Sequence, residues 1–238
     1  MAAHGPAEWL SSPLGRQLVA AEASLLKGLL DDVFGLELLQ LGIWGAPRQL
    51  LAGSRTRRQT VIAENPLSEV DVMARLNALP IQSATVDAVL LPHTLEFDSE
   101  PQAVVREADR VLTGEGQLIV LGFHPVSLWG LRAAAAREGF PPGLQRMLSP
   151  RRVHDWLGLL GYEVSLQKHY LFSRPWDDGS DSARRILRRG LMNPLPAAAW
   201  IMRARKHVYR MTPIRLRFSR ERRPVIAPLP EPTRRGHS

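Results

Sequence analysis

Apolar side chains recur at spacings of three and four from Leu14 to Val33, a pattern that places them along one face of a helix. The residues Ser12-Pro13 stand directly before this stretch, and a hydroxyl N-cap followed by proline is typical of a helix start. Gly35 is expected to end the helix. The apolar run from 36 to 41 follows at once and predicts a buried strand.

Further along the chain, apolar runs alternate with helical patterns. The segment 98–116 predicts a helix with Pro101 in its first turn and Gly114 at its end, and a second capped helix is predicted over 149–161. Further strands are expected at 58–64, 76–82, 86–91, 117–123, 162–172 and 197–208.

These strands read as nearly continuous apolar runs, as in a mostly parallel sheet that helices cover on both faces. The last two differ, because their connector, 173–195, carries prolines and glycines around one or two arginine-rich helical turns and no full crossover helix. An antiparallel pair fits this connector better than another parallel unit. We therefore expect an α/β fold with a mostly parallel seven-stranded sheet that ends in an antiparallel hairpin.

Length and composition narrow the class of protein. At 238 residues and 45% apolar composition, the chain is long enough for one domain with appendages. It has no run of about 18 consecutive apolar residues, so no membrane span is expected. The N-terminal sequence MAAHGPAEWL lacks the pattern of a secretory signal, and a cytoplasmic location is expected. The absence of cysteine excludes disulfides, thiolate metal sites and cysteine nucleophiles.

The net charge of +8 is concentrated at the C-terminal end. Residues 1–180 carry 16 Lys and Arg against 20 Asp and Glu, whereas residues 203–238 carry 11 against two. A nucleic-acid-binding domain would more often spread such charge over one face. We expect an N-terminal helical segment, 1–35, a main domain, 36–206, and a disordered basic tail rich in Pro and Arg, 207–238. Through that tail the chain could contact nucleic acid or another acidic partner.

The stretch LLQLGIWGAPRQLLAG, residues 38–53, has the layout of a nucleotide-binding turn: a buried strand, a loop with Gly42 and Gly45, and a short helix. Glycine after the strand allows a ligand to approach the backbone closely. Trp44 stands between the glycines, where such turns usually keep a small residue. We expect its indole to pack beneath or beside the loop while the two glycines keep the backbone accessible.

The order of motifs over roughly 36–206 resembles the class I S-adenosylmethionine-dependent methyltransferases, in particular a little-characterised bacterial branch that is methyltransferase type 11-like. The stretch ALPIQSATVDAVLLPHTLEF resembles the family's Leu-Pro, Asp and fourth-strand signature, and READRVLTGEGQLIVLGF resembles its helix, glycine turn and fifth strand. WLSSPLGRQLVAAEASLL is similar to the N-terminal helix of that branch. The resemblance implies a Rossmann-like class I methyltransferase fold, S-adenosylmethionine as cofactor, and methyl transfer as the reaction.

The same resemblance implies where the cofactor contacts the chain. Glu64, 22 residues after Gly42, stands where the family's acid accepts hydrogen bonds from the ribose hydroxyls. The adenine would be held by the backbone of Leu76 and the amide of Asn77, and His93 would meet the cofactor's amino-acid end or an acceptor. The cofactor-binding candidates are Gly42, Trp44, Gly45, Glu64, Leu76, Asn77 and His93.

Three positions depart from the family's commoner pattern. Gln40 replaces the acid two residues before the loop glycine, Trp44 fills the loop, and Arg75 stands where an acid often meets the adenine amino group. These departures leave open a degenerate, non-catalytic binding module that uses its basic tail. A nicotinamide-dependent oxidoreductase is the other alternative, because Gly42 and Glu64 suit its ribose contact too, although the chain lacks a full G-x-G-x-x-G.

Other chemistry-bearing residues also have ordinary structural roles open to them. Asp87 is expected to cap or pair at the entry of the fourth strand, and His124 is either a general base or a turn residue. Trp129 and Trp176 either line an apolar acceptor pocket or lie in the core or cover it. The seven histidines have no paired metal-ligand spacing. LPHT follows the fourth strand in place of the Asn/Asp-Pro-Pro-aromatic motif used on bases or glutamine, which favours a small-molecule acceptor.

Overall fold

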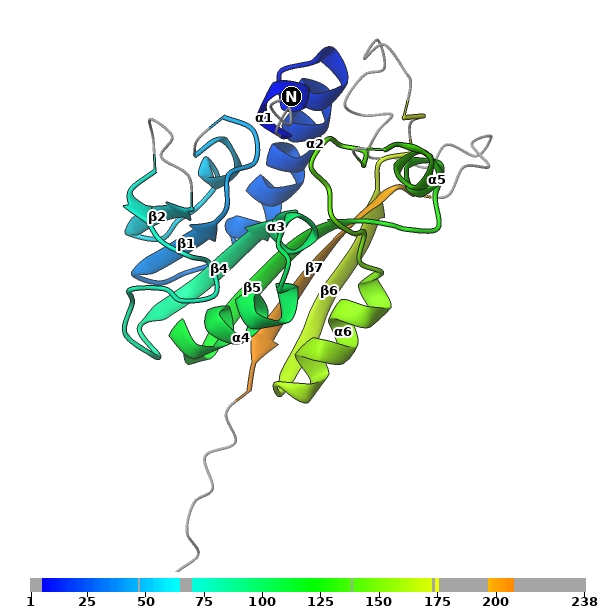
Figure 1. Cartoon of the computed structure of the whole chain (residues 1–238). Coiled ribbons are helices and arrows are strands. Elements are labelled where there is room, and N and C mark those ends of the chain that lie inside the picture. The colour runs from blue at the N-terminus through cyan, green and yellow to red at the C-terminus, as the bar shows by residue number, and fades with distance from the viewer. Residues whose placement is uncertain are drawn as a thin grey trace, which may run out of the picture. The chain divides into compact units, whose positions relative to one another are not determined.

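The computed structural model describes residues 6–46, 48–64, 70–137, 139–172, 174–175 and 197–207. Its strands form one seven-stranded sheet in the order β3-β2-β1-β4-β5-β7-β6, with helices on both faces (Figure 1). The strands are β1 Glu37–Leu41, β2 Arg58–Ala63, β3 Val72–Met73, β4 Val86–Pro92, β5 Leu112–Phe123, β6 Tyr162–Tyr170 and β7 Ala199–Lys206. The helices are α1 Pro6–Leu10, α2 Pro13–Leu30, α3 Thr94–Phe97, α4 Pro101–Val111, α5 Leu128–Ala135, α6 Pro150–Leu159 and the 3-10 turn η1 Gln49–Leu51.

Neighbouring strands are parallel from β3 through β5, and β7 runs antiparallel to both β5 and β6. The predicted α/β fold, a mostly parallel seven-stranded sheet with a late antiparallel hairpin, is therefore confirmed. The strand order reverses between β1 and β4, since β2 and β3 extend the sheet on one side and β5 extends it on the other. In open α/β sheets, ligands bind outside the carboxyl ends of the strands at such a reversal.

Serine caps begin α2 and α6 where the sequence predicts them. Oγ of Ser12 accepts a hydrogen bond from the Gly15 amide (3.1 Å) at the start of α2, and Oγ of Ser149 accepts from the Arg152 amide (3.3 Å) at the start of α6. Both predicted starts are confirmed. Ser127 caps α5 in the same way, although the sequence analysis did not predict that helix.

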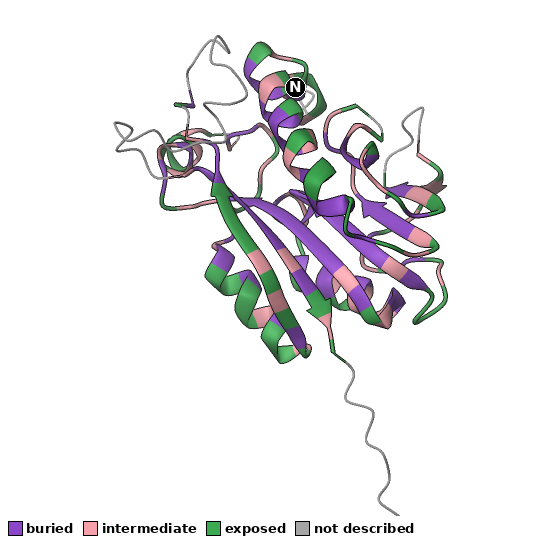
Figure 2. Ribbon diagram, turned by 180° about the vertical axis from the view of Figure 1, so that it is seen from behind, coloured by how far each residue is buried: buried purple, intermediate pink, exposed green. Residues whose placement is uncertain are grey.

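The two faces of the sheet are buried by different helices (Figures 1 and 2). Helix α2 packs on one face and α4 with α6 on the other, and side chains along a strand alternate between the two cores. In β4, for example, Ala88 and Leu90 face α2, whereas Val89 and Leu91 face α4 and α6. The edge strand β6 is more exposed (Figure 2). The N-terminal helix α2 is thus part of the main core.

The predicted strand over 76–82 is wrong. Leu76 and Leu79 are buried, but they lie in an irregular segment that packs beside α4. The Leu79 amide donates to Oε1 of Glu107 on α4 (2.7 Å), so this backbone group bonds a side chain and not a neighbouring strand. The third strand is instead the two-residue β3, which pairs with the end of β2.

Two predicted helix ends also differ from the structure. Helix α4 ends at Val111 and not at Gly114, because Leu112 already pairs with Val86 of β4. Helix α2 ends at Leu30, before Gly35. At α4, pairing with a distant strand thus ends the helix earlier than the local glycine signal predicts.

The arginine-rich turns expected between the late strands, and the disordered basic tail, lie outside the described residues, at 176–196 and 208–238. No helix in the described part of the chain is long and apolar enough to cross a membrane.

Candidate functional site

A hollow of about 860 Å³ opens at the carboxyl ends of β1, β2 and β4. Its volume falls within the range of about 300–1,000 Å³ that is typical of small-molecule sites. Helix α1 and the first turns of α2 form the wall that faces the strand ends. We call this hollow the main cavity. Its lining residues include Leu10, Arg16, Gly42, Glu64, Thr94 and Asp98.

Gly42 turns the chain out of β1 at the edge of the main cavity. Its φ of +86° is a left-handed conformation that glycine adopts without steric cost. Its amide donates to the Ile62 carbonyl (2.8 Å), which ties the loop to β2. A Cβ atom here would lie 3.0 Å from Oγ1 of Thr94, whose hydroxyl donates to the Leu41 carbonyl (2.5 Å). Both the turn and the close packing of α3 therefore favour glycine.

Gly45 brings the same loop against α2. Its φ is +78°, and a Cβ atom would lie only 2.4 Å from Cγ1 of Val19. Gly45 and Val19 both line the main cavity, next to Ala46 and Gln49. The loop between β1 and η1 therefore packs tightly on the N-terminal helix while its inner side stays open to the cavity.

Glu64 follows β2 and carries the carboxylate that the sequence assigns to a ribose. Its Oε1 accepts a hydrogen bond from the Leu76 amide (3.2 Å), and both residues line the main cavity. A second hollow of about 460 Å³ adjoins it and shares Glu64, Phe97 and Asp98 with it. Asn77 lines this second hollow, and its Nδ2 donates to Oε2 of Glu100 (3.3 Å). The two hollows form one continuous surface around Glu64.

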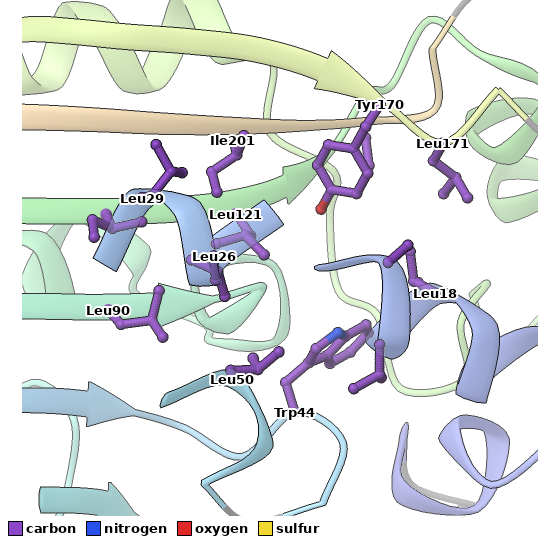
Figure 3. Close-up of a cluster of buried hydrophobic side chains, with 14 of the residues drawn as sticks. Leu18, Leu26, Leu29, Trp44, Leu50, Leu90, Leu121, Tyr170, Leu171 and Ile201 are labelled. Carbon is purple, nitrogen blue, oxygen red and sulfur yellow. The ribbon is translucent and has the colours of Figure 1, made fainter. Parts of the chain in front are cut away.

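Trp44 lies beneath the loop, as the sequence analysis expects. Its side chain is only 1% exposed and belongs to the core on the α2 side of the sheet. Figure 3 shows its indole nitrogen and the hydroxyl of Tyr170 pointing toward the same space. Glu22 of α2 fills that space: its Oε2 accepts from Nε1 of Trp44 (2.7 Å), and its Oε1 accepts from the Tyr170 hydroxyl (2.8 Å).

His93 does not line either hollow. It is fully buried, directly after β4, with a left-handed φ of +56°. Its Nε2 lies 2.9 Å from Oε1 of Glu22, and its Nδ1 lies 2.9 Å from Oε2 of Glu96. Oε1 of Glu96 accepts from the backbone amides of Phe123 (2.8 Å) and Leu148 (3.3 Å). The histidine that the sequence places at the cavity edge is thus held between two buried carboxylates.

Burial and the neighbouring carboxylates shift the pKa of His93 in opposite directions. Burial lowers the pKa of His93, but the carboxylates of Glu22 and Glu96 outweigh it and raise that pKa from 6.5 to about 9. Burial raises the pKa of Glu96, against the effect of its hydrogen bond with His93. Burial also raises the pKa of Tyr170 well above its usual value, and Glu22 adds to the effect, so the phenol is a neutral donor.

Other residues singled out by the sequence have structural surroundings. Oδ2 of Asp87 accepts from the amides of Leu36 (2.6 Å) and Glu37 (3.1 Å), so Asp87 organises the start of β1. His124 accepts a hydrogen bond at Nδ1 from the Val126 amide (3.1 Å) in the turn after β5, and burial, with a contribution from His169, lowers its pKa. Trp129 is fully buried in the core, and Trp176 lies outside the described residues.

Sequence reasoning missed Glu22, Arg16 and the wall formed by α1. A signal for Glu22 was available, because this residue lies four positions after Leu18 and four before Leu26, in the apolar stripe of the predicted helix. A carboxylate at a core position indicates a buried partner. The partner itself, His93, lies 71 positions away, and no local pattern identifies it.

The structure brings most of the cofactor candidates together. Those that line the main cavity are Gly42, Trp44, Gly45, Glu64 and Leu76. Asn77 lines the adjoining hollow, and His93 lies beneath the loop without reaching either surface. Among the described residues, no group of three or more His, Asp or Glu side chains is arranged to hold a metal ion.

Comparison with known proteins agrees with this geometry. The sequence profile of a family described as a methyltransferase domain matches residues 45–120. The protein YafS of Escherichia coli is 33% identical over 170 residues, which cover 71% of this chain and 70% of YafS. The chain belongs to the class I S-adenosylmethionine-dependent methyltransferases. Similarity extends to Rv2003c of Mycobacterium tuberculosis, 32% identical over 184 residues that cover 70% of this chain and 60% of Rv2003c.

Solved structures show the same fold at low sequence identity. One is a Thermotoga maritima protein described as a possible histamine N-methyltransferase, with a TM-score of 0.61 and 21% identity, covering 84% of this chain and 93% of that one. Another is a methyltransferase from Archaeoglobus fulgidus, with a TM-score of 0.58 and 14% identity, covering 80% and 94%. At such identities the likeness establishes the fold of this chain and nothing about its reaction or substrates.

The main cavity fits the family's cofactor, S-adenosylmethionine. The two glycines turn the backbone along the cavity wall, so a ligand can approach main-chain atoms there. The carboxylate of Glu64 offers about four lone-pair sites, of which the Leu76 amide uses one. It can therefore still accept hydrogen bonds from a vicinal diol.

Proposed function

We propose that this protein transfers the methyl group of S-adenosylmethionine to a small-molecule acceptor bound in the main cavity. The observation that carries the proposal is the convergence of the Gly42–Gly45 loop and Glu64 on one hollow at the carboxyl ends of β1, β2 and β4. The bound cofactor supplies an electrophilic methyl group on a sulfonium. The work of the chain is therefore chiefly to position two ligands and to exclude water.

On this proposal, each contact with the cofactor has a candidate residue. Glu64 accepts hydrogen bonds from the ribose hydroxyls, and the backbone at Leu76 with the amide of Asn77 holds the adenine side. The backbone at Gly42 and Gly45 borders the cofactor closely. Arg75 lines the hollow that contains Asn77, so the departure from the common acidic residue lies at this end of the site.

The acceptor is proposed to occupy the part of the main cavity beside α1. Pro6, Ala7 and Leu10 make that wall mainly apolar, and the exposed side chains of Ser11 and Arg16 add polar groups at its rim. Small apolar molecules with one polar or anionic group match this wall. Methyl transfer needs little covalent help, so no catalytic side chain is assigned.

Calorimetric titration with S-adenosylmethionine and S-adenosylhomocysteine tests the proposal first. Micromolar binding by the wild type, weakened in a Glu64→Ala variant, would support it. A cell extract incubated with methyl-labelled cofactor would then show whether the label enters the small-molecule fraction. Absence of binding at millimolar ligand, with folding confirmed by circular dichroism, would overturn the proposal. Label found only in protein or nucleic acid would overturn the assignment of the acceptor class.

A further inference from the structure

Five side chains from distant parts of the chain form a polar group in the core beneath the cofactor loop: Glu22, Trp44, His93, Glu96 and Tyr170. We call this group the buried polar cluster. Every member is at most 1% exposed. Removing two carboxylates from water is costly unless each is well bonded, and apolar residues of similar size would fill the same space at less cost. The presence of these groups at this position therefore needs a reason beyond stability.

The hydrogen bonds of the cluster are well matched to two ionised carboxylates. Three donors meet Glu22, from Trp44, Tyr170 and His93, and three meet Glu96, from His93 and two backbone amides. A neutral imidazole would place one bare nitrogen against a carboxylate oxygen, whereas a doubly protonated ring donates to both. The geometry thus favours an imidazolium between the carboxylates, with Glu22 fixed from three sides.

Trp44 is the member of the cluster that also lines the main cavity. Its ring lies over His93, with centroids 4.4 Å apart and planes tilted by 33°, close enough for a cation–π attraction. Phe97 and Phe123 pack around it at centroid distances of 5.7 and 6.0 Å. The indole is therefore held both by a charge-assisted hydrogen bond and by the rings around it.

Hydrogen bonds hold the two ends of the turn: the Gly42 amide donates to the Ile62 carbonyl, Nε2 of Gln40 donates to the Gly42 carbonyl (3.0 Å), and the Ala46 amide donates to Oε1 of Gln49. Gly42 and Gly45 are both left-handed and lack side chains, and the indole of Trp44 between them ties the middle of the turn to the core. Fixing the indole fixes the middle of the turn from which the cofactor is approached. Because Glu22 lies on α2, the same bond also sets the loop relative to the helix whose first turns line the main cavity.

We propose that Glu22 is a positioning residue for cofactor binding: by holding the indole of Trp44, it holds the backbone of residues 42–46 in the shape that receives S-adenosylmethionine. This inference rests on the proposed function for the identity of the ligand. It assigns no chemical step to Glu22 or His93, since both are fully buried and neither touches the cavity.

A purely structural cluster would stabilise the fold without a particular effect on the loop, and matched substitutions separate the two cases. Trp44→Phe keeps an aromatic ring and removes the donor to Glu22. Trp200→Phe is the control, because Trp200 is also 1% exposed and its Nε1 donates to the carbonyls of Phe123 (3.2 Å) and Leu148 (3.0 Å), away from the cavity lining. Both changes remove a buried indole donor, and both are expected to lower the melting temperature.

Of the two tryptophan substitutions, only Trp44→Phe is expected to weaken cofactor binding. The Kd for S-adenosylhomocysteine should rise about tenfold in Trp44→Phe and in Glu22→Gln, and less than about twofold in Trp200→Phe. The double variant Glu22→Gln/Trp44→Phe should bind about as well as the weaker single variant, because glutamine has one acceptor oxygen for the three donors that meet Glu22 and so weakens the same bond that Trp44→Phe removes. Equal affinity in Trp44→Phe and Trp200→Phe would overturn the proposal.

Hydrogen exchange provides a readout that needs no ligand. The amide of Gly42 is bonded to the Ile62 carbonyl and that of Ala46 to Oε1 of Gln49 (3.3 Å). Both amides should exchange faster in Trp44→Phe and Glu22→Gln, while amides within β1 keep their wild-type rates; unchanged loop exchange would refute the positioning role. If the wild type binds no S-adenosylhomocysteine, the proposed function fails, and this measurement still decides the role of Glu22. If Glu22→Gln does not fold, the two tryptophan variants decide it.

Discussion

A Cβ atom on Gly45 would lie 2.4 Å from Cγ1 of Val19, a distance too short for any side chain. The cofactor loop and helix α2 are therefore in direct contact, and the left-handed φ of Gly45 adds a second reason for glycine. Glycine at a nucleotide-binding turn is usually explained by the ligand. In this protein the contact with Val19 of α2 already requires a glycine at position 45.

The Gly45→Ala substitution is expected to lower the free energy of unfolding by about 2–4 kcal/mol, because it combines a left-handed alanine with a clash against Val19. Urea denaturation measures the change. The Gly45→Ala/Val19→Ala double variant should lose less than the sum of the two single variants, since the smaller side chain removes the clash. Strict additivity would contradict the steric part of this explanation.

Gly28→Ala is the control for the loop glycine. Gly28 lies inside α2, and a Cβ atom there would meet nothing within 4 Å. Alanine at this helical position is expected to raise the free energy of unfolding by about 0.5–1 kcal/mol. A loss of stability in this variant would contradict the open space around position 28.

Glu64→Ala should weaken cofactor binding by about 1–3 kcal/mol, because a ribose diol would lose its charged acceptor. Glu64→Gln should lose less, since it keeps one acceptor oxygen. The exposed Glu115, which pairs with Arg205 on the sheet at 2.8 Å, offers a control in Glu115→Gln. Calorimetry with S-adenosylhomocysteine measures all three variants, and an unchanged Kd in Glu64→Ala would remove Glu64 from the site.

Stability should fall as the pH rises from about 6.5 to about 9. The pKa of His93 is raised from 6.5 to about 9 in the folded protein, so its charged form contributes stability below pH 6.5 that is lost as the pH rises through the folded value. The groups that face it are Glu22 from α2, Glu96 from α3 and, through Glu22, Tyr170 from β6. The full effect is on the order of 3 kcal/mol.

Denaturation curves at several pH values, for the wild type and His93→Gln, measure this dependence. The raised pKa of Glu96 acts in the same direction, beginning above its ordinary value of 4.5, and Tyr170 titrates above the window. The variant removes the contribution of His93, and it also removes the hydrogen bond that lowers the pKa of Glu96. Parallel pH profiles in the two proteins would show that the imidazole does not carry the charge.

Asp87→Ala should lower the free energy of unfolding by about 1–3 kcal/mol, because the amides of Leu36 and Glu37 lose a shared acceptor. Affinity for S-adenosylhomocysteine should not change, since Asp87 lies at the start of β4, at the opposite end of the strand from the cavity. A weakened Kd would mean that the start of β1 and the cofactor loop are coupled along the strand.

Local signals in the sequence predicted the elements whose causes are local. The serine-proline starts of α2 and α6 were predictable because a side chain and its neighbouring amides make the cap. The continuous apolar runs of β1, β4 and β5 were predictable because both faces of these strands are buried. The hairpin was predictable because the sequence of the connector before the last strand lacks the pattern of a full crossover helix.

The failures have long-range causes. Leu76 and Leu79 are apolar because they pack beside α4, and an irregular segment can bury them as well as a strand can. Helix α4 ends and β5 begins at Leu112 because this residue pairs with β4. No glycine marks this position in the sequence. His93 was placed correctly after the fourth strand, but its surroundings depend on Glu22, which lies on α2, 71 positions earlier in the chain. The position of a residue along the chain predicts that it lies at the edge of the sheet. It does not predict how deeply the side chain is buried.

The packing of α2 on the sheet has a consequence for how the protein can be divided. The family profile matches only residues 45–120, and the sheet begins at Glu37, so a fragment designed around either boundary would omit α2. Such a fragment would leave apolar residues of β4 and β5 open to water and His93 without one of its counter-ions. Trimming the chain to its diagnostic motifs would thus be expected to yield an aggregation-prone product instead of a minimal enzyme.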